Sequence, residues 1–171
     1  MSVIPPINFK KWIKNNRHLL KPPVGNKVVY DRGDFIIMVV GGPNSRKDYH
    51  VDPVEEFFYQ IEGDMILKII EDGNQVDINI MEGEIFLLPK NIPHSPQRFK
   101  NTVGLVVEYK RAEGEMDAFQ WYCDNCGNLL HEVTLQLENI VSQLPPLFNN
   151  YWKNIDSRTC SNCGETQDQP I

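Results

Sequence analysis

The sequence lacks a run of about 18 apolar residues, which a membrane-spanning helix requires. Residues 1–6 also lack the basic start and apolar stretch of a leader peptide. Positive charge is not in excess, because 17 Lys and Arg stand against 23 Asp and Glu, a net charge of −6. Binding to a phosphate backbone needs a basic surface. We therefore expect a cytoplasmic protein that binds neither membranes nor nucleic acid.

Cysteine is scarce and confined to the last third of the chain. Its four copies form two Cys-x-x-Cys pairs, Cys123 with Cys126 and Cys160 with Cys163, each followed by glycine. In a chain without a secretion signal, this spacing predicts a closed metal site with four thiolates, which has no open position for a substrate. Iron and zinc both suit such a site. Two disulfides are the alternative.

The apolar pattern divides the chain into three parts. Between Ile7 and Leu20 apolar residues recur at helical spacing, and Pro22 and Pro23 end the pattern. Short β-rich runs bounded by turn residues follow, at residues 35–40, 65–70, 76–80, 85–88 and 103–107. Residues 134–152 predict an amphipathic helix that Pro145 and Pro146 interrupt.

Many short strands with no helix between them predict an antiparallel sandwich or barrel. The expected fold is mainly β, a small jelly-roll barrel over residues 28–111. An N-terminal helical segment, residues 1–27, packs on it, and residues 112–171 form a C-terminal extension with a helix and the four-cysteine site.

Three residues within the predicted barrel form a candidate metal site. His50 and Glu56 are six residues apart, so both side chains share one face if the segment is a locally regular strand, although Pro53 bends it. His94 follows a later strand and returns a second imidazole to the same region. Two imidazoles and one carboxylate are the ligand set of non-haem Fe(II) oxygenases. The alternative for each histidine is a hydrogen-bonded core residue.

The same residues resemble the two cupin motifs. The matching positions are His50, Glu56, Gly63, Gly83, Pro89 and His94. The second histidine of the first motif is replaced by Asp52, and the second motif has Asn91 for glycine and Arg98 for asparagine. Provided that Asp52 does not bind the metal, its replacement of the histidine leaves two histidines and one carboxylate as the metal ligands. The resemblance implies a cupin double-stranded β-helix.

Several segments closely resemble the 3-hydroxyanthranilate 3,4-dioxygenase family. They are residues 19–24, 41–50, 55–60, 86–89, 93–98 and 107–108. The segment Trp121-Tyr-Cys-Asp-Asn-Cys126 resembles the bacterial and fungal type of this family, which has a second metal site. The resemblance implies Fe(II) at His50, Glu56 and His94, O2 as co-substrate, iron at the four cysteines, and a homodimer.

The implied reaction opens the ring of 3-hydroxyanthranilate to give 2-amino-3-carboxymuconate semialdehyde, a precursor of quinolinate and NAD in the kynurenine pathway of tryptophan degradation. Arg98 and Arg46 are the candidates for the substrate carboxylate, because a guanidinium matches it with two parallel hydrogen bonds. Arg46 could instead contact oxygen or close over the site. Glu108 matches the family's carboxylate that contacts the hydroxyl and amino groups, and it could accept a proton.

Two other functions remain open from the sequence. One is a different metal-dependent cupin, either a dioxygenase for another catechol-like acid or a metal isomerase. The other is a non-enzymatic ligand-binding cupin with a tail like a zinc ribbon.

Overall fold

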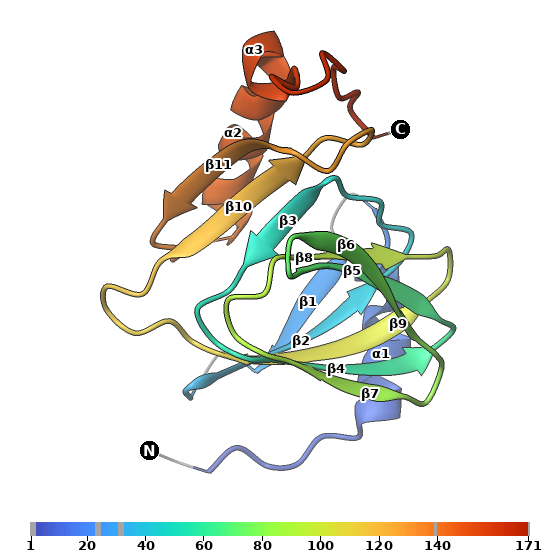
Figure 1. Ribbon diagram of the computed structural model, residues 1–171. Coiled ribbons are helices and arrows are strands. Elements are labelled where there is room, and N and C mark those ends of the chain that lie inside the picture. Colours follow the sequence, from blue (N-terminus) through green and yellow to red (C-terminus); the bar gives the residue numbers. More distant parts are fainter. Residues whose placement is uncertain (1–2, 23–24, 31–32, 139, 171) are drawn as a thin grey trace.

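The computed structural model of the chain describes residues 3–22, 25–30, 33–138 and 140–170. Two antiparallel sheets face each other (Figure 1). The five-stranded sheet has the order β1 (Asn26–Tyr30), β2 (Phe35–Gly41), β9 (Val103–Tyr109), β4 (Glu56–Glu62) and β7 (Ile85–Leu88). The six-stranded sheet has the order β11 (Leu129–Leu135), β10 (Asp117–Tyr122), β3 (Asp48–Val51), β8 (His94–Arg98), β5 (Met65–Glu71) and β6 (Asn74–Ile80). The predicted mainly β fold of the cupin type is thus confirmed.

The core between the sheets follows from the alternation of side chains along each strand. Phe58 and Val106 of one sheet pack with Leu67 and Ile69 of the other. In the five-stranded sheet, Glu56 lies two residues from Phe58 and Glu108 two residues from Val106, so both belong to the same inward-facing rows and are buried. Alternation therefore places both the apolar core and a polar site between the sheets.

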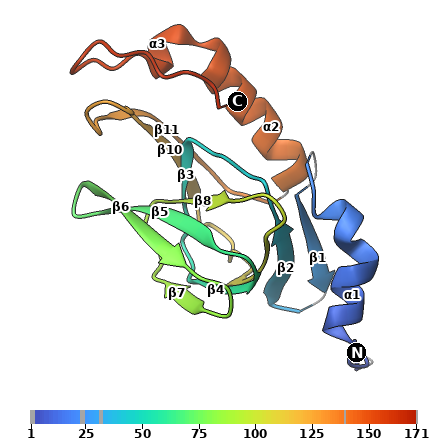
Figure 2. The same ribbon diagram turned by 90° about the vertical axis from the view of Figure 1, so that its right-hand side faces the viewer.

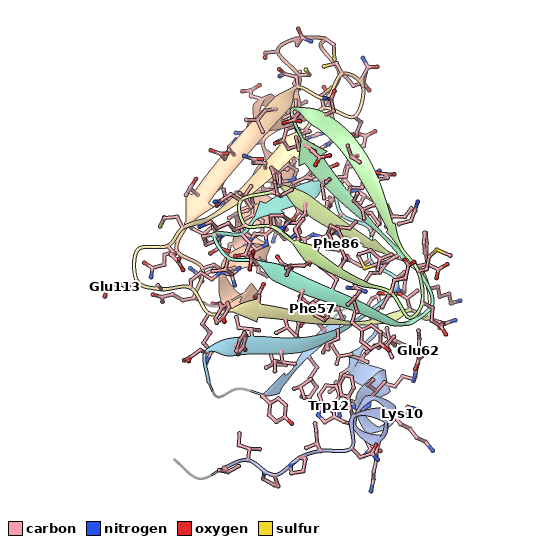
Figure 3. All side chains as sticks on the ribbon, turned by 60° about the horizontal axis from the view of Figure 1, so that its bottom comes forward. Lys10, Trp12, Phe57, Glu62, Phe86 and Glu113 are labelled. Carbon is pink, nitrogen blue, oxygen red and sulfur yellow. The ribbon has the colours of Figure 1, made fainter. Side chains whose placement is uncertain are left out.

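The N-terminal helix α1 (Phe9–Asn16) covers the outer face of the five-stranded sheet, as Figure 2 shows beside β1. Asn8 caps it by accepting a hydrogen bond from the backbone N–H of Lys11 at 2.9 Å. Ile13 and Trp12 pack against Val39 and other residues of that face, and Figure 3 labels Trp12 there. A 3₁₀ turn, η1 (Arg17–Leu19), completes the segment.

The C-terminal extension starts with two strands that the sequence pattern did not reveal. β10 pairs with β3, and β11 pairs with β10, so the extension widens the six-stranded sheet. Helix α2 (Ile140–Lys153) and the short α3 (Ile155–Arg158) follow. No helix within the described ranges is long and apolar enough to cross a membrane.

The predicted interruption of this helix at Pro145 and Pro146 is wrong, because both prolines lie inside α2. The physical reason is packing. Phe148 and Tyr151 of α2 join Phe119 and Trp121 of β10 in one apolar cluster. Burying each large apolar side chain stabilises by about 1.5–3 kcal/mol. The α2 side chains in this cluster therefore together offset the roughly 3 kcal/mol that each of the two interior prolines costs; they are Leu144, Leu147, Phe148, Tyr151 and Trp152.

Candidate active site

Strand register brings the predicted site residues together. His50 of β3 lies directly opposite His94 of β8, and Glu56 of β4 lies directly opposite Glu108 of β9. The two pairs belong to opposite sheets and face each other across the interior. His50 and Glu56 therefore do not share one strand face as expected, since the chain leaves β3 at Val51 and enters β4 at Glu56.

The three predicted metal ligands converge at one point. The Glu56 Oε1 atom is 2.8 Å from His94 Nε2 and 3.6 Å from His50 Nδ1. One possible ligand atom from each residue lies within 4.8 Å of the other two. Two imidazoles and one carboxylate at this separation suit a single divalent transition metal. The residues present therefore fit the group that the sequence predicts.

Each imidazole is oriented by a contact of the ring nitrogen that faces away from Glu56. His94 Nδ1 donates to the backbone carbonyl of Ile92 at 3.0 Å, which turns Nε2 toward Glu56. His50 Nε2 is 2.7 Å from Asp117 Oδ1, which leaves Nδ1 facing Glu56. Such partners on the second nitrogen are typical of histidines that bind metals, because they fix the ring and its tautomer.

The electrostatics of this point favour a cation. Burial opposes ionisation of Glu56, but the two histidines outweigh it and hold the pKa of Glu56 well below its usual value. Burial also disfavours a charged His50, yet Asp117 and Glu56 raise the pKa of His50 to about 9. A positive charge is therefore stabilised between these groups.

Arg98 places a guanidinium deep in the site without a carboxylate partner. It is only 4% exposed, and its Nη1 donates to Gln60 Oε1 at 3.1 Å. Its Nε has no hydrogen-bond partner, and no Asp or Glu of the described residues forms an ion pair with it. Burial, only partly opposed by Glu56, lowers the pKa of Arg98 to about 10, so the group stays charged at neutral pH.

Gly104 makes room for that guanidinium. This glycine of β9 stands opposite Gln60 in β4, and a β-carbon there would overlap Arg98 Nη1 and crowd Gln60 Oε1. The position of Arg98 therefore depends on the absence of a side chain at residue 104.

Arg46 reaches the same cavity from the segment before β3. Gln97 fixes its backbone, accepting from the Arg46 N–H at 3.2 Å and donating to its carbonyl at 3.0 Å. The side chain forms an ion pair with Asp48, with Nε donating to Oδ2 at 3.1 Å. Burial opposes the charge on Arg46, but Asp48 raises its pKa. Arg46 is thus a partnered cation, unlike Arg98.

Glu108 is buried at the side of the site opposite Arg98. It is 5% exposed, and its Oε1 accepts from Arg111 Nη1 at 2.9 Å. Burial and the nearby Glu56 raise the pKa of Glu108, while Arg111 opposes the shift. A carboxylate with a raised pKa accepts a proton more readily, which suits a general base.

Asp52, at the position of the missing cupin histidine, has partners for both of its oxygens. Oδ1 accepts from the backbone N–H of Val54 at 2.9 Å, and Oδ2 accepts from Arg111 Nη2 at 2.6 Å. Both oxygens of Asp52 thus accept hydrogen bonds from other groups of the protein, although Asp52 lies near Glu56 and Glu108.

A cavity of about 150 Å³ is lined by the three predicted metal ligands and by Arg46, Arg98, Glu108 and Arg111. In another protein an apolar cavity of about 150 Å³ holds one benzene molecule. Apolar walls come from Met38, Val40, Phe58, Pro96, Val106, Phe119, Leu137 and Leu144. A second hollow shares five lining residues with the first, namely Asn26, Val40, Asn44, Arg46 and Leu144. The cavity suits one aromatic ring with polar substituents directed at the charged residues.

The four cysteines form a separate cluster at the end of β10 and the loop after α3. All four are free, with Sγ atoms of Cys123 and Cys163 3.5 Å apart and those of Cys126 and Cys160 3.6 Å apart. Tetrahedral ligands at 2.3 Å from a metal lie roughly 3.8 Å apart, so the donor set fits one ion. Gly127 and Gly164 adopt positive φ angles, which closes each turn behind its cysteine pair.

Sequence reasoning missed several residues that shape the site, namely Gln60, Gln97, Gly104, Arg111 and Asp117. Gln60 stands at an even spacing from Glu56 on the same strand, so alternation could have pointed to it. Gln97 stands at an odd spacing from His94, so alternation could not have pointed to it. Arg111 is the last residue of the predicted barrel and Asp117 lies beyond it, and neither carries a motif signal.

Comparison with known proteins assigns the family. The family described as 3-hydroxyanthranilic acid dioxygenase matches residues 1–152. A protein of Jannaschia sp. named 3-hydroxyanthranilate 3,4-dioxygenase is 56% identical over 166 residues, covering 96% of this chain and 92% of the relative. One of Xanthomonas campestris with the same name is 50% identical over 168 residues, covering 98% and 95%.

A solved structure from Neisseria meningitidis shares the fold, with a TM-score of 0.50 and 21% identity over 61% of this chain and 99% of that one. The match to the family model and the extent of the sequence identity agree with the motifs found in the sequence. The chain belongs to the 3-hydroxyanthranilic acid dioxygenase family.

Proposed function

We propose that this protein is an Fe(II)-dependent ring-cleaving dioxygenase that converts 3-hydroxyanthranilate and O2 into 2-amino-3-carboxymuconate semialdehyde. Both oxygen atoms enter the product, so the reaction needs no external reductant. The product leads to quinolinate and NAD. The names of the relatives support the substrate, and the chemistry of the cavity supports it independently.

The observation that carries this proposal is the unpaired guanidinium of Arg98 beside the histidine–carboxylate triad. A buried charge without a partner is costly, so such a site favours a ligand that brings the opposite charge. A carboxylate on an aromatic ring meets this need with two parallel hydrogen bonds. The ring then lies between the apolar walls of the cavity.

His50, Glu56 and His94 would hold the iron. Fe(II) held there would polarise the hydroxyl and amino groups of the substrate and would supply a path for electrons between the substrate and O2. Glu108 accepts the proton of the substrate hydroxyl, for which its raised pKa suits it. Phe58 and Val106 exclude water from the ring. Arg46, held by Asp48 and Gln97, lies where the two hollows meet and contacts the incoming substrate or oxygen.

We assign the four cysteines to a second metal ion, iron or zinc, that stabilises the C-terminal extension. This site offers no open position, so we place it outside the reaction. The homodimer and the cytoplasmic location remain predictions from the sequence.

The test is anaerobic loading of the purified protein with Fe(II), followed by 3-hydroxyanthranilate and then air. The proposal expects one O2 consumed per substrate and the absorbance of the ring-opened product. Anthranilate lacks the hydroxyl and 2-aminophenol lacks the carboxylate, so both serve as controls that react poorly. Oxygen uptake only with another catechol-like acid would favour a different dioxygenase. Tight binding without oxygen uptake would favour a ligand-binding cupin.

A further inference from the structure

Arg111 is a buried cation in the segment between β9 and β10 that joins three carboxylates. Its side chain is 6% exposed. Nη1 donates to Glu108 Oε1 at 2.9 Å, and Nη2 donates to Asp52 Oδ2 at 2.6 Å and to Asp117 Oδ1 at 2.8 Å. Nε also donates to Asp117 Oδ1, at 3.1 Å. Every nitrogen of the guanidinium is therefore engaged.

The partners of Arg111 belong to two different functional parts of the site. Glu108 faces the proposed substrate position. Asp117, which is fully buried, also contacts His50 Nε2 at 2.7 Å and so orients a proposed metal ligand. One planar group thus sets the relative position of the proposed base and of one proposed ligand.

The register explains why a cation is needed at this place. Glu108 lies directly opposite Glu56 across the β4–β9 ladder, and like charges in such a pair repel each other. Asp52 adds a further carboxylate within 4.8 Å of both. The hydrogen bond from Val54 N–H to Asp52 Oδ1 holds the Asp52 carboxyl group in place. Without Arg111, Glu108 would be free to turn away from Glu56.

We propose that Arg111 is a positioning residue, which holds Glu108 toward the substrate and, through Asp117, holds His50 toward the metal. The inference rests on the proposed function. Asp52 takes part as the anchor of Arg111, which gives a physical role to the residue that replaces the second cupin histidine.

The test compares Arg111→Lys with the wild-type protein. A lysine keeps the charge, but its single ammonium cannot reproduce the planar fork to Glu108 and Asp117. We expect kcat to fall about a hundredfold, the loss typical of a misplacement of about 1 Å. The Kd for Fe(II), measured anaerobically by titration without substrate, should rise about tenfold or more, as when the partner of a metal-binding histidine is lost.

The matched control is Lys110→Gln, which removes a charge from the neighbouring exposed residue. It should change neither kcat nor the Kd for Fe(II). Asp117→Asn is a second variant in case Arg111→Lys fails to fold. It keeps the shape of Asp117 and should raise the Kd for Fe(II) about tenfold or more. Asp52→Asn should lower kcat about tenfold, because it weakens the hydrogen bond by which Asp52 Oδ2 holds Arg111 Nη2.

A folded Arg111→Lys protein with a lower melting temperature but unchanged kcat and Fe(II) affinity would show that Arg111 is only structural, and would overturn the inference. If Arg111→Lys does not fold, an unchanged Fe(II) affinity in Asp117→Asn together with an unchanged kcat in Asp52→Asn would overturn it. If the wild-type protein binds Fe(II) but does not cleave the ring, the proposed function fails. The Fe(II) titrations then still test whether Arg111 positions His50 through Asp117.

Discussion

Replacing Arg98 with methionine should move ligand affinity and protein stability in opposite directions. Arg98 is 4% exposed, its Nε has no partner, and its guanidinium makes one hydrogen bond, to Gln60. If a substrate carboxylate completes its shell, loss of the pair costs about 3 kcal/mol, within the roughly 2–5 kcal/mol found for buried charge pairs. That energy corresponds to about a hundredfold increase in Kd.

The stability of the substrate-free protein should not fall with the affinity. Arg98→Met removes a buried cation that no carboxylate of the described residues pairs with, and keeps much of the side-chain volume. Replacing buried charge by apolar groups is often neutral or stabilising by about 1–4 kcal/mol. For a chain of this size, each 1 kcal/mol raises the melting temperature by about 2–4 °C. We therefore expect a melting temperature that is unchanged or a few degrees higher.

The assay is anaerobic calorimetry of 3-hydroxyanthranilate binding to the iron-loaded protein, with thermal unfolding measured in the absence of substrate. Arg17→Met is the matched control. Arg17 is 44% exposed and forms an ion pair at 2.6 Å with Glu62, which Figure 3 labels. Exposed ion pairs of this kind contribute little to the free energy of unfolding. Unchanged substrate affinity together with a destabilised protein in Arg98→Met would refute the role of Arg98 as the carboxylate partner.

Two further variants test the surroundings of this group and the second metal site. Gly104→Ala adds a β-carbon against Arg98 Nη1. Calorimetry should show weaker substrate binding in this variant with Fe(II) content unchanged, and normal affinity would contradict the fit between Gly104 and Arg98. Replacing both Cys123 and Cys126 by serine should lower the melting temperature while the folded, iron-loaded fraction keeps its kcat. Loss of kcat in well-folded protein would place the cysteine site within the reaction.

The sequence predicted those parts of the site that follow from local periodicity and motif spacing. Arg98 lies four residues after His94 on a regular strand, so alternation alone directs both side chains inward. Glu108 ends a β-rich run, and its even spacing from Val106 directs it inward too. His50, Glu56 and His94 were recognisable because their spacing matches a known motif.

The remainder depends on pairing between distant segments, which local patterns do not encode. Arg111 and Asp117 meet only because the segment between them brings β10 back beside β3. The need for glycine at residue 104 appears only when Arg98 occupies the space above it. Pro145 and Pro146 were misjudged because the apolar contacts of α2 with β10, invisible in a local pattern, outweigh the backbone cost.

Anomalous scattering at the iron edge, recorded from crystals of the Fe(II)-loaded protein, tests most directly whether the three groups share one ion. The account predicts a peak within bonding distance of an imidazole nitrogen of His50, an imidazole nitrogen of His94 and a carboxylate oxygen of Glu56. Iron-loaded crystals that bind the metal elsewhere and leave this point without a peak would contradict it.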